Sequence, residues 1–276
     1  MAKLSTISPF LRLKHLVATS GFAGAATALR GRWRGMMPLR HPELGLLSRE
    51  DDMIDAVLVR RIGPDWNCLD IGAHLGSVYY RLTQIAPRGT HAMIEASPSK
   101  ARMLRERFGD HAVHEVAVTD ETGEVSFFEN IDMPGFSSLA NRASRGRVVE
   151  RRVKACRLDD LIGDARVDFI KIDIEGFEYP ALRGATGLLK RCRPLIEFEA
   201  GAATDSDLAA GRTEALFDWL TTEMDYDIYA AFDLFYDRPP ITARQFASYR
   251  SYPFLAFNYF AVPKVGPAPS APDDPR

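Results

Sequence analysis

From Cys68 onward, short apolar runs alternate with stretches whose apolar residues recur at helical spacing. The runs are "CLDI", "HAMIEA", "AVHEVAV", "VDFIKIDI" and "PLIEFEA", and the helical stretches cover residues 78–85, 99–108, 179–189 and 213–224. Strands that alternate with helices form right-handed crossovers and a parallel sheet with helices on both faces. Two further apolar segments, 226–235 and 254–262, complete the sheet with an antiparallel C-terminal strand. The pattern therefore predicts an α/β fold with a mostly parallel, twisted sheet.

This alternation defines one domain over residues 48–263. The domain begins with a helix that ends near Arg61, and Ser48 with Asp51 forms a capping box at the start of this helix. Residues 121–154 break the alternation and predict a β excursion with a long polar loop. Beyond Pro263, the Pro-rich segment 264–276 predicts a disordered tail.

Residues 1–47 form a separate segment without sustained periodicity. Residues 1–48 hold seven Lys and Arg against one acid, Glu43. One interpretation is a signal peptide, because residues 16–29 are uncharged and contain an A-x-A triplet. The alternative, which we prefer, is a basic N-terminal arm that docks on the domain or associates weakly with a membrane surface.

The cellular compartment is indicated by what the sequence does not contain. No apolar stretch reaches the roughly 18 residues that a membrane-spanning helix requires. The three cysteines have irregular spacing and form no CxxC pair, which favours a reducing compartment. We therefore expect a cytoplasmic protein without a transmembrane segment.

The run "CLDIGAHLG" places an acid and two glycines where the first strand turns into the first helix of the sheet. Ligands of open parallel sheets bind at such turns, and Gly72 and Gly76 allow a close approach of the backbone. Asp70 ends the strand, where its charge would repel a diphosphate. A cationic ligand fits this turn better, and S-adenosylmethionine carries both an ammonium and a sulfonium.

A second acid strengthens this interpretation. Glu95 ends the next strand, nineteen residues after Gly76, where a carboxylate can accept hydrogen bonds from ribose hydroxyls. The glycine pattern alone also occurs in ordinary turns, but Glu95 in register makes that alternative less favourable. Asp70, Gly72, Ala73, Gly76 and Glu95 are therefore candidate cofactor-binding residues.

Several motifs together resemble the FkbM-type methyltransferases, a branch of the Rossmann-like enzymes that depend on S-adenosylmethionine. The similarity covers roughly residues 50–263 and is carried by "DIGAHLG", "AVTDETGEVSFFE", "SSL", "RLDDLI", "VDFIKIDIEGFEYPALRGA", "PLIEFE" and "NYFAVP". The resemblance implies a class I methyltransferase fold and O-methylation of a sugar, glycan or secondary-metabolite hydroxyl. Ala117 and Val118, in the second of these motifs, join the candidate cofactor-binding residues.

His74 departs from the pattern that the resemblance implies, because the wider methyltransferase class usually has a glycine at this place and this family often has an asparagine. We therefore expect no backbone requirement for a positive φ at His74. We expect its imidazole to face the cofactor or the substrate, which makes His74 a candidate for both cofactor binding and catalysis. The remaining histidines favour structural or solvated positions.

The chemistry of methyl transfer to a hydroxyl requires a group that accepts the hydroxyl proton. "FIKIDIEG" supplies Asp173 at the end of a central strand and Glu175 in the following turn, and both are candidate catalytic residues. Strand alternation puts Lys171 on the same face as Asp173. A buried lysine requires a partner, so we expect Lys171 to pair with Glu197 or Glu199 and to orient the site. The alternative is a lysine that reaches solvent at the rim of the sheet.

Acidic side chains at these strand ends raise the question of a metal. Asp173, Glu197 and Glu199 could ligate magnesium or manganese, but nothing in their spacing requires it, and such carboxylates also cap helices. We therefore expect S-adenosylmethionine as the cofactor and do not favour a metal.

Other features distinguish the remaining function classes. The basic stretch 142–154 favours either a phosphorylated substrate or a solvated strand face, and residues 137–139 ("SSL") favour either a binding loop or a solvated one. We expect no nucleic-acid partner, because the net charge is -2 and no broad basic surface is indicated. A nicotinamide-dependent oxidoreductase and a non-catalytic cofactor-binding protein remain as alternatives.

Overall fold

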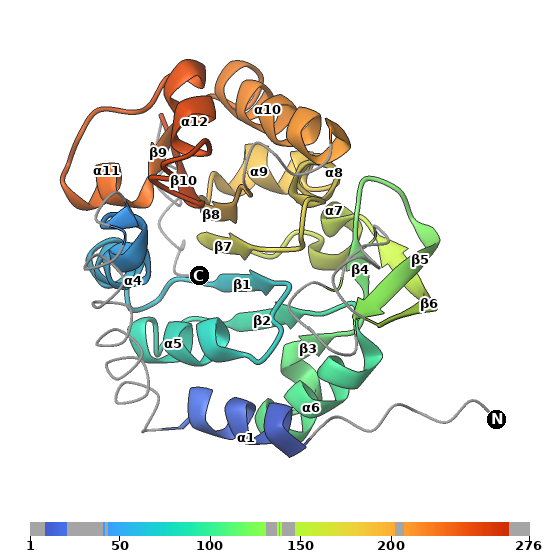
Figure 1. Cartoon of the computed structure of the whole chain (residues 1–276). Helices are drawn as coiled ribbons and strands as arrows, with labels where there is room; N and C mark the ends of the chain where they lie inside the picture. The colour runs from blue at the N-terminus through green and yellow to red at the C-terminus, as the bar shows by residue number, and fades with distance from the viewer. Residues whose placement is uncertain are drawn as a thin grey trace, which may run out of the picture.

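The structure is a computed structural model, and it describes residues 9–20, 41, 44–130, 137, 139, 147–201 and 207–264. Its centre is a seven-stranded sheet with the order β3-β2-β1-β7-β8-β10-β9 (Figure 1). The strands are β1 Cys68–Ile71, β2 His91–Ile94, β3 Val113–His114, β7 Phe169–Ile172, β8 Leu195–Glu199, β9 Tyr226–Ala230 and β10 Asn258–Pro263. Only β10 runs antiparallel to its neighbours among these strands. The predicted fold class is confirmed, including the antiparallel C-terminal strand.

Helices cover both faces of this sheet. They are α4 Glu50–Arg61, α5 Ser77–Ile85, α6 Pro98–Phe108, α7 Leu158–Ile162, α8 Glu178–Arg183, α9 Thr186–Cys192, α10 Asp207–Thr222, α11 Ala231–Phe235 and α12 Ala243–Tyr249. Cys68, Phe169 and Leu195 of one sheet face pack with α4, α5 and α11. Ile170 and Ile196 of the other face pack with α8, α9 and α10. Strands β1, β7 and β8 are therefore buried on both sides, as their continuous apolar runs indicate.

A second, three-stranded sheet lies beside the first, at the right of Figure 1. It contains β4 Ala117–Val118, β5 Gly123–Asn130 and β6 Val148–Cys156, where β6 pairs antiparallel with β5 and parallel with β4. The predicted strand "AVHEVAV" is thus divided between two sheets, since Val113–His114 extends the main sheet and Ala117–Val118 belongs to the second one. Most of the loop between β5 and β6 lies outside the described residues.

The predicted helix start at Ser48 and Asp51 is only partly right. Helix α4 ends at Arg61 as expected, but it begins at Glu50 without a side-chain cap. Ser48 donates its hydroxyl to Gly45 O instead (2.8 Å), so the capping box was wrong. Glu50 is buried and accepts hydrogen bonds from the amides of Phe257 and Asn258 (2.8 and 2.9 Å). The first turn of α4 is therefore held by tertiary contacts to β10.

Two other predicted elements divide where packing requires it. The stretch 179–189 contains two helices, α8 and α9, because the chain breaks at Gly184, where a Cβ atom would lie 2.2 Å from Thr119 O. The segment 226–235 is a strand only to Ala230, and α11 follows it. Burial alternates along β9 but is continuous over residues 231–234, so the second half has no strand period.

The described part of the predicted N-terminal arm contains one helix, α1 (Pro9–Ala18), which lies along α6 at the bottom of Figure 1. His15 and Thr19 are buried in this contact. The predictions for residues 21–40 and for the tail 265–276 fall outside the described residues. Within the described ranges, no helix combines the length and the apolar character that crossing a bilayer requires.

Candidate active site

The turn after β1 has three residues in the left-handed region. Gly72 has φ 79°, His74 has φ 49° and Gly76 has φ 73°. A Cβ atom on Gly72 would lie 2.0 Å from Asp173 O, so this glycine allows the turn to touch the end of β7. The expectation that His74 has no need for a positive φ was wrong. The bend requires left-handed backbone there, and histidine is among the non-glycine residues that adopt it more often.

The amide groups of this turn already have acceptors within the protein. Gly72 and Ala73 donate to Ile94 O (2.9 and 3.3 Å), and His74 donates its backbone N–H to Glu95 Oε2 (2.9 Å). The other oxygen of Glu95 accepts from the backbone N–H of Ser97 (2.8 Å). These three turn amides are thus unavailable to a phosphate, and the Glu95 carboxylate has a fixed orientation.

Asp70 caps the helix that follows the turn. It is buried, and its Oδ2 accepts a hydrogen bond from Tyr79 N–H in the first turn of α5 (3.0 Å). Burial raises the pKa of Asp70 to about 6, although Lys171 opposes this rise. A carboxylate near the N-terminus of a helix also complements the helix dipole. Asp70 therefore holds the turn in place and contributes negative charge beneath it.

A row of charged side chains crosses the sheet beside this turn. Asp70, Lys171 and Glu197 are paired in register on β1, β7 and β8, and all three are buried. Burial lowers the pKa of the Lys171 ammonium, but Asp173, Glu197 and Asp70 outweigh burial and raise it above its ordinary value. A buried ammonium among carboxylates is the arrangement that makes a lysine tolerable in a central strand.

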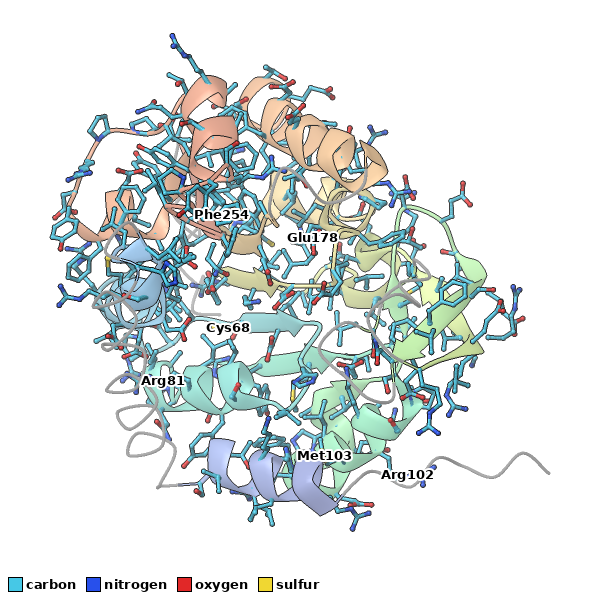
Figure 2. The ribbon with its side chains drawn as sticks, in the orientation of Figure 1. Cys68, Arg81, Arg102, Met103, Glu178 and Phe254 are labelled. Atoms are coloured by element: carbon cyan, nitrogen blue, oxygen red, sulfur yellow. The ribbon has the colours of Figure 1, made fainter. Side chains whose placement is uncertain are left out.

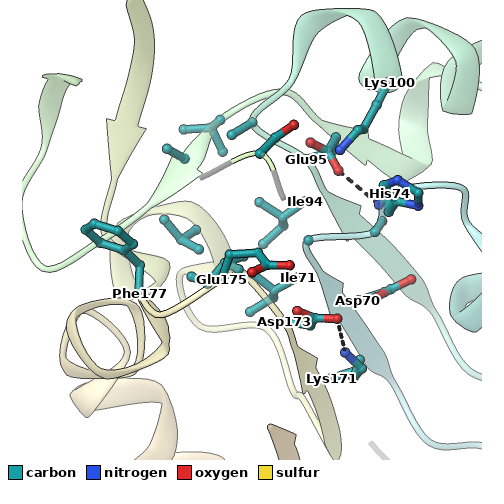
Figure 3. Close-up of a pocket in the computed structure, with 18 of the residues that line it drawn as sticks. Asp70, Ile71, His74, Ile94, Glu95, Lys100, Lys171, Asp173, Glu175 and Phe177 are labelled. Atoms are coloured by element: carbon teal, nitrogen blue, oxygen red, sulfur yellow. Dashed lines mark hydrogen bonds and ion pairs between the residues drawn. The ribbon is translucent and has the colours of Figure 1, made fainter. Parts of the chain in front are cut away.

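The ion pair of Lys171 differs from the predicted one. Its Nζ lies 3.4 Å from Asp173 Oδ2 (Figure 3), whereas Glu197 and Glu199 act on it through longer-range attraction. The expectation that Lys171 pairs directly with Glu197 or Glu199 was therefore wrong in its partner. The alternative of a solvated rim lysine is also wrong, because the residue is only 7% exposed. Sequence spacing could not decide whether Lys171 pairs with Asp173, two residues further along the chain, or with an acid on the neighbouring strand β8.

Asp173 and Glu199 form a hydrogen-bonded carboxyl pair. Burial raises the pKa of Glu199 to about 9, and the Asp173 charge adds to this effect. Burial also raises the pKa of Asp173, but the Lys171 ammonium and the hydrogen bond from Glu199 outweigh it and lower that pKa. At neutral pH, Glu199 therefore holds the proton and Asp173 is an anion.

One cavity of about 330 Å³ lies at the carboxyl ends of β1, β2 and β7. Its volume is within the range of small-molecule sites. It brings together most of the predicted site residues, some of which Figure 3 labels, namely Asp70, Gly72, Ala73, His74, Glu95, Ala117, Val118, Lys171, Asp173 and Glu175. Gly76, Glu197 and Glu199 do not line the cavity. Gly76 packs against Phe108 and Leu104 instead, where a Cβ atom would lie 2.7 and 2.8 Å from the side chains.

The ring of His74 forms part of the cavity wall beside Lys100 (Figure 3). Burial and the Lys100 charge lower the pKa of His74 to about 3, so the imidazole is neutral at physiological pH. Its Nε2 is buried and has no hydrogen-bond partner within the described structure. A ligand in the cavity could supply that partner.

Several residues that line the cavity were not predicted. Lys100 is in the first turn of α6, Phe127 is on β5, and Phe177 follows the turn after β7 and stacks beneath the Arg212 guanidinium at 4.6 Å. The "SPS" segment before Lys100 was a usable signal, because a helix that begins directly after β2 brings its first turn to the same edge of the sheet. No sequence signal indicated that Phe127 would face inward.

Glu178 was also missed, although it belongs to the "IEGFE" motif. Its buried Oε1 accepts hydrogen bonds from the amides of Ile174 and Gly176 (2.9 and 3.2 Å). This closes the turn in which Glu175 has φ 58° and Gly176 has φ 92°. Glu178 therefore shapes the loop that carries Glu175 into the cavity wall.

Glu129 attaches the second sheet to the site. It is buried and accepts hydrogen bonds from the hydroxyls of Ser97 and Ser99 (2.5 and 2.6 Å) and from Arg151 Nε (2.5 Å). Arg151, in the basic stretch 142–154, thus has a structural contact, and residues 142–146 lie outside the described residues. Ser137 and Leu139 of "SSL" do line the cavity.

Asp173, Glu197 and Glu199, the candidate metal ligands, do not form a common site. Asp173 and Glu199 bond to each other, and Glu197 lies in register with Lys171. Among the residues with described positions, no group of three or more His, Cys, Asp or Glu is arranged to hold a metal ion.

The comparison with known families decides the identity of this domain. A family model described as the methyltransferase FkbM domain matches residues 70–228, which is more than half of the chain. The chain belongs to the FkbM methyltransferase family. The matched residues include the glycine turn, the residues of both sheets that line the cavity, and the acidic residues Asp173, Glu197 and Glu199. The part of the chain that matches the family therefore contains the candidate site.

Solved structures with partial similarity to the FkbM domain include three methyltransferases. Methyltransferase FkbM from Methylobacillus flagellatus KT is 19% identical with a TM-score of 0.44, over 73% of this chain and 44% of that chain. An O-methyltransferase from Bacillus cereus in complex with S-adenosylhomocysteine (SAH) is 15% identical with a TM-score of 0.43, over 76% and 79%. A putative O-methyltransferase from Klebsiella pneumoniae is 14% identical with a TM-score of 0.44, over 83% and 90%. The chain thus spans less than half the length of the Methylobacillus protein. No curated protein matches the chain.

Proposed function

We propose that this FkbM domain transfers the methyl group of S-adenosylmethionine to a hydroxyl oxygen of a sugar, a glycan or a secondary metabolite. The observation that carries the proposal is the acid-lined cavity at the carboxyl ends of β1, β2 and β7 in a chain of this family. Ligands of open α/β sheets bind at this edge.

The charges of the cavity favour a cationic nucleoside. Among the described lining residues, four are carboxylic acids and two are lysines: Asp70, Glu95, Asp173 and Glu175 against Lys100 and Lys171. The amides of Gly72, Ala73 and His74 already donate to protein acceptors. The carboxylates would therefore repel a diphosphate, and these three amides could not donate hydrogen bonds to it. Both effects speak against a nicotinamide dinucleotide as the ligand.

Glu95 is suited to hold a ribose. Each of its oxygens accepts one backbone N–H, from His74 and Ser97, and a carboxylate oxygen can accept a second hydrogen bond. The cavity wall next to Glu95 is apolar and includes Ile94, Val118 and Phe127, a surface on which a purine can pack. These contacts support S-adenosylmethionine as the cofactor.

Asp173 is the residue that we assign as proton acceptor. When bound, S-adenosylmethionine supplies an electrophilic methyl group. Asp173 lines the cavity as an anion and can accept the proton of a hydroxyl that approaches it, which typically contributes roughly 100-fold to 10,000-fold to the rate. Lys171 and Glu199 act through Asp173 as positioning residues. The Lys171 ammonium forms an ion pair with the Asp173 carboxylate, and Glu199 donates a hydrogen bond to it.

His74 and Glu175 have supporting roles in this proposal. His74 is neutral and offers Nε2 as an acceptor to a polar group of cofactor or substrate. Glu175, in the turn that follows β7, extends the acidic part of the cavity wall towards Phe177 (Figure 3). No step requires a divalent metal, and the cytoplasmic location stays a prediction.

The test uses the full chain with methyl-labelled S-adenosylmethionine and a panel of nucleotide sugars, oligosaccharides and polyketide alcohols. We expect SAH release together with label on an oxygen of one acceptor class, at least 100-fold slower in Asp173→Asn. Asp168→Asn is a matched control, since Asp168 lies outside the cavity and accepts a hydrogen bond from the backbone N–H of Asn67 (2.8 Å). Label on nitrogen or carbon would overturn the hydroxyl assignment. Cofactor binding without transfer to any acceptor would favour the non-catalytic alternative.

A further inference from the structure

We propose that α1 docks the protein on an anionic lipid surface through an outward apolar face. This face, here called the α1 face, consists of Leu13, Leu16 and Val17. The proposal concerns the outer surface of α1 and does not rest on the proposed methyl acceptor.

The inner side of α1 is fixed to the domain. His15 is buried, donates Nδ1–H to Leu75 O in the glycine turn (2.7 Å) and meets the Phe108 ring edge-on at 6.1 Å. Arg107 donates to Thr19 O (2.7 Å). The helix therefore has one defined orientation, and its opposite side must face outward.

The α1 face is exposed and continuous. Leu13 is 59% exposed, Leu16 57% and Val17 37%. At 100° per residue these three side chains occupy an arc of about 100° on the helix surface. Arg12 and Lys14 are exposed and flank this arc on either edge. An apolar stripe with basic edges is the pattern of helices that lie in the plane of a membrane interface, where the long side chains reach the headgroups.

Charge selects an anionic lipid surface as the occupant. Helix α1 carries Arg12 and Lys14 and no acidic residue. The adjacent helix α6 exposes Arg102, labelled in Figure 2, and one acid, Glu106; its Arg107 is also exposed but donates to Thr19 O. The cytoplasmic leaflet is negatively charged, and each nearby Lys or Arg strengthens binding to it roughly fivefold.

The other large exposed apolar residues of the described structure do not form such a face. Val59, Val149, Tyr236 and Tyr252 lie on separate elements. Only α1 gathers three on successive turns of one helix among the described elements. Because His15 bonds Leu75, docking of α1 would bring the glycine-turn side of the cavity close to the lipid surface.

The experiment is co-sedimentation of the full chain with vesicles at low and high salt. One set of vesicles contains phosphatidylglycerol and phosphatidylcholine, and the other contains phosphatidylcholine alone. We expect binding to the anionic vesicles that weakens with salt, and at least tenfold weaker binding for the double variant Leu13→Asp, Leu16→Asp. Arg12→Gln and Lys14→Gln should each weaken it roughly fivefold. Val59→Asp, a helical control whose side chain is also exposed (53%), should stay within twofold of wild type.

Two measurements keep the outcome decisive. Thermal melting of each variant verifies that the fold is retained, because all substituted side chains are exposed. Light scattering after size exclusion reports a self-association through α1. Absence of binding to anionic vesicles at low salt, equal loss in Val59→Asp, or a dimer that the Leu13/Leu16 variant dissolves without any vesicle binding would overturn the proposal. The last result would assign the α1 face to a second copy of this chain.

Discussion

Replacing Lys171 by methionine tests how the buried charges of the site are balanced. Methionine has a similar length, so the substitution removes the ammonium without opening a large cavity. The ammonium lies 3.4 Å from Asp173 and in register with Asp70 and Glu197, and the residue is 7% exposed. Removing it leaves the buried Asp70 and Glu197 carboxylates, and the partly exposed Asp173, without their common counter-ion.

The expected loss in the free energy of unfolding is about 3–5 kcal/mol at pH 8, the usual cost of removing one partner of a buried ion pair. For a chain of this size this lowers Tm by roughly 6–20 °C. The matched control is Lys264→Met. Lys264 lies 3.6 Å from Asp225, but the two side chains are 39% and 59% exposed, so the control should lose about 1 kcal/mol or less.

The sign of the pH dependence follows from the carboxyl groups. Burial raises the pKa of Asp70 to about 6 and of Glu197 to about 7, and Lys171 opposes both shifts. Without the ammonium both pKa values rise further. A carboxyl whose folded pKa lies above its unfolded pKa contributes stability at low pH and loses it as pH rises through the folded pKa. The deficit of Lys171→Met should therefore grow between about pH 5 and pH 8.

Urea unfolding of wild type, Lys171→Met and Lys264→Met at several pH values measures this deficit. A loss below about 1 kcal/mol for Lys171→Met, or a loss that does not change with pH, would refute the inferred charge balance.

Three further predictions concern the turn, the ribose acid and the carboxyl pair. Gly72→Ala should lower the free energy of unfolding by about 2–5 kcal/mol, and Gly163→Ala by only about 1–2 kcal/mol, as measured by urea unfolding. Both glycines have a positive φ, but nothing lies within 4 Å of a Cβ atom on Gly163. Equal losses would exclude a role for the contact of Gly72 with Asp173 O. Glu95→Gln should weaken S-adenosylmethionine binding roughly tenfold or more in calorimetry, from loss of charged hydrogen bonds, and unchanged affinity would remove Glu95 from the ribose site. The pKa of Glu199 is raised to about 9, so wild type should keep losing stability between about pH 7 and pH 9, above the raised pKa values of Asp70 and Glu197. Glu199→Gln should abolish this part of the decline. A decline between about pH 7 and pH 9 that persists in urea titrations of the variant would assign it to other groups.

Much of the fold follows from local pattern. The runs around Asp70, Glu95, Lys171 and Glu197 are strands in the predicted places, because buried parallel strands require continuous apolar sequence. Three features depended on contacts between distant segments. Helix 179–189 breaks at Gly184 because Thr119 O approaches it, and Ser48 does not cap α4 because Glu50 is held by β10. The strand "AVHEVAV" divides because its second half joins another sheet.

The sequence could predict the location of those site residues whose position depends only on the order and direction of the strands. Asp70 lies one residue before the end of β1, and Glu95 and Asp173 directly follow β2 and β7. These adjacent parallel strands end at one edge of the sheet, where the cavity lies. The pairing of Asp173 with both Lys171 and Glu199 depends on side-chain geometry that spacing does not encode. The positive φ of His74 likewise was not predicted, and its backbone N–H is bound by Glu95 of the neighbouring strand end.

Calorimetric titration of the full chain with S-adenosylmethionine and, separately, with NAD tests the preference of the cavity most directly. We expect saturable binding of S-adenosylmethionine and no detectable binding of NAD. Binding of NAD without binding of S-adenosylmethionine would contradict the assignment of this acidic cavity to a cationic nucleoside.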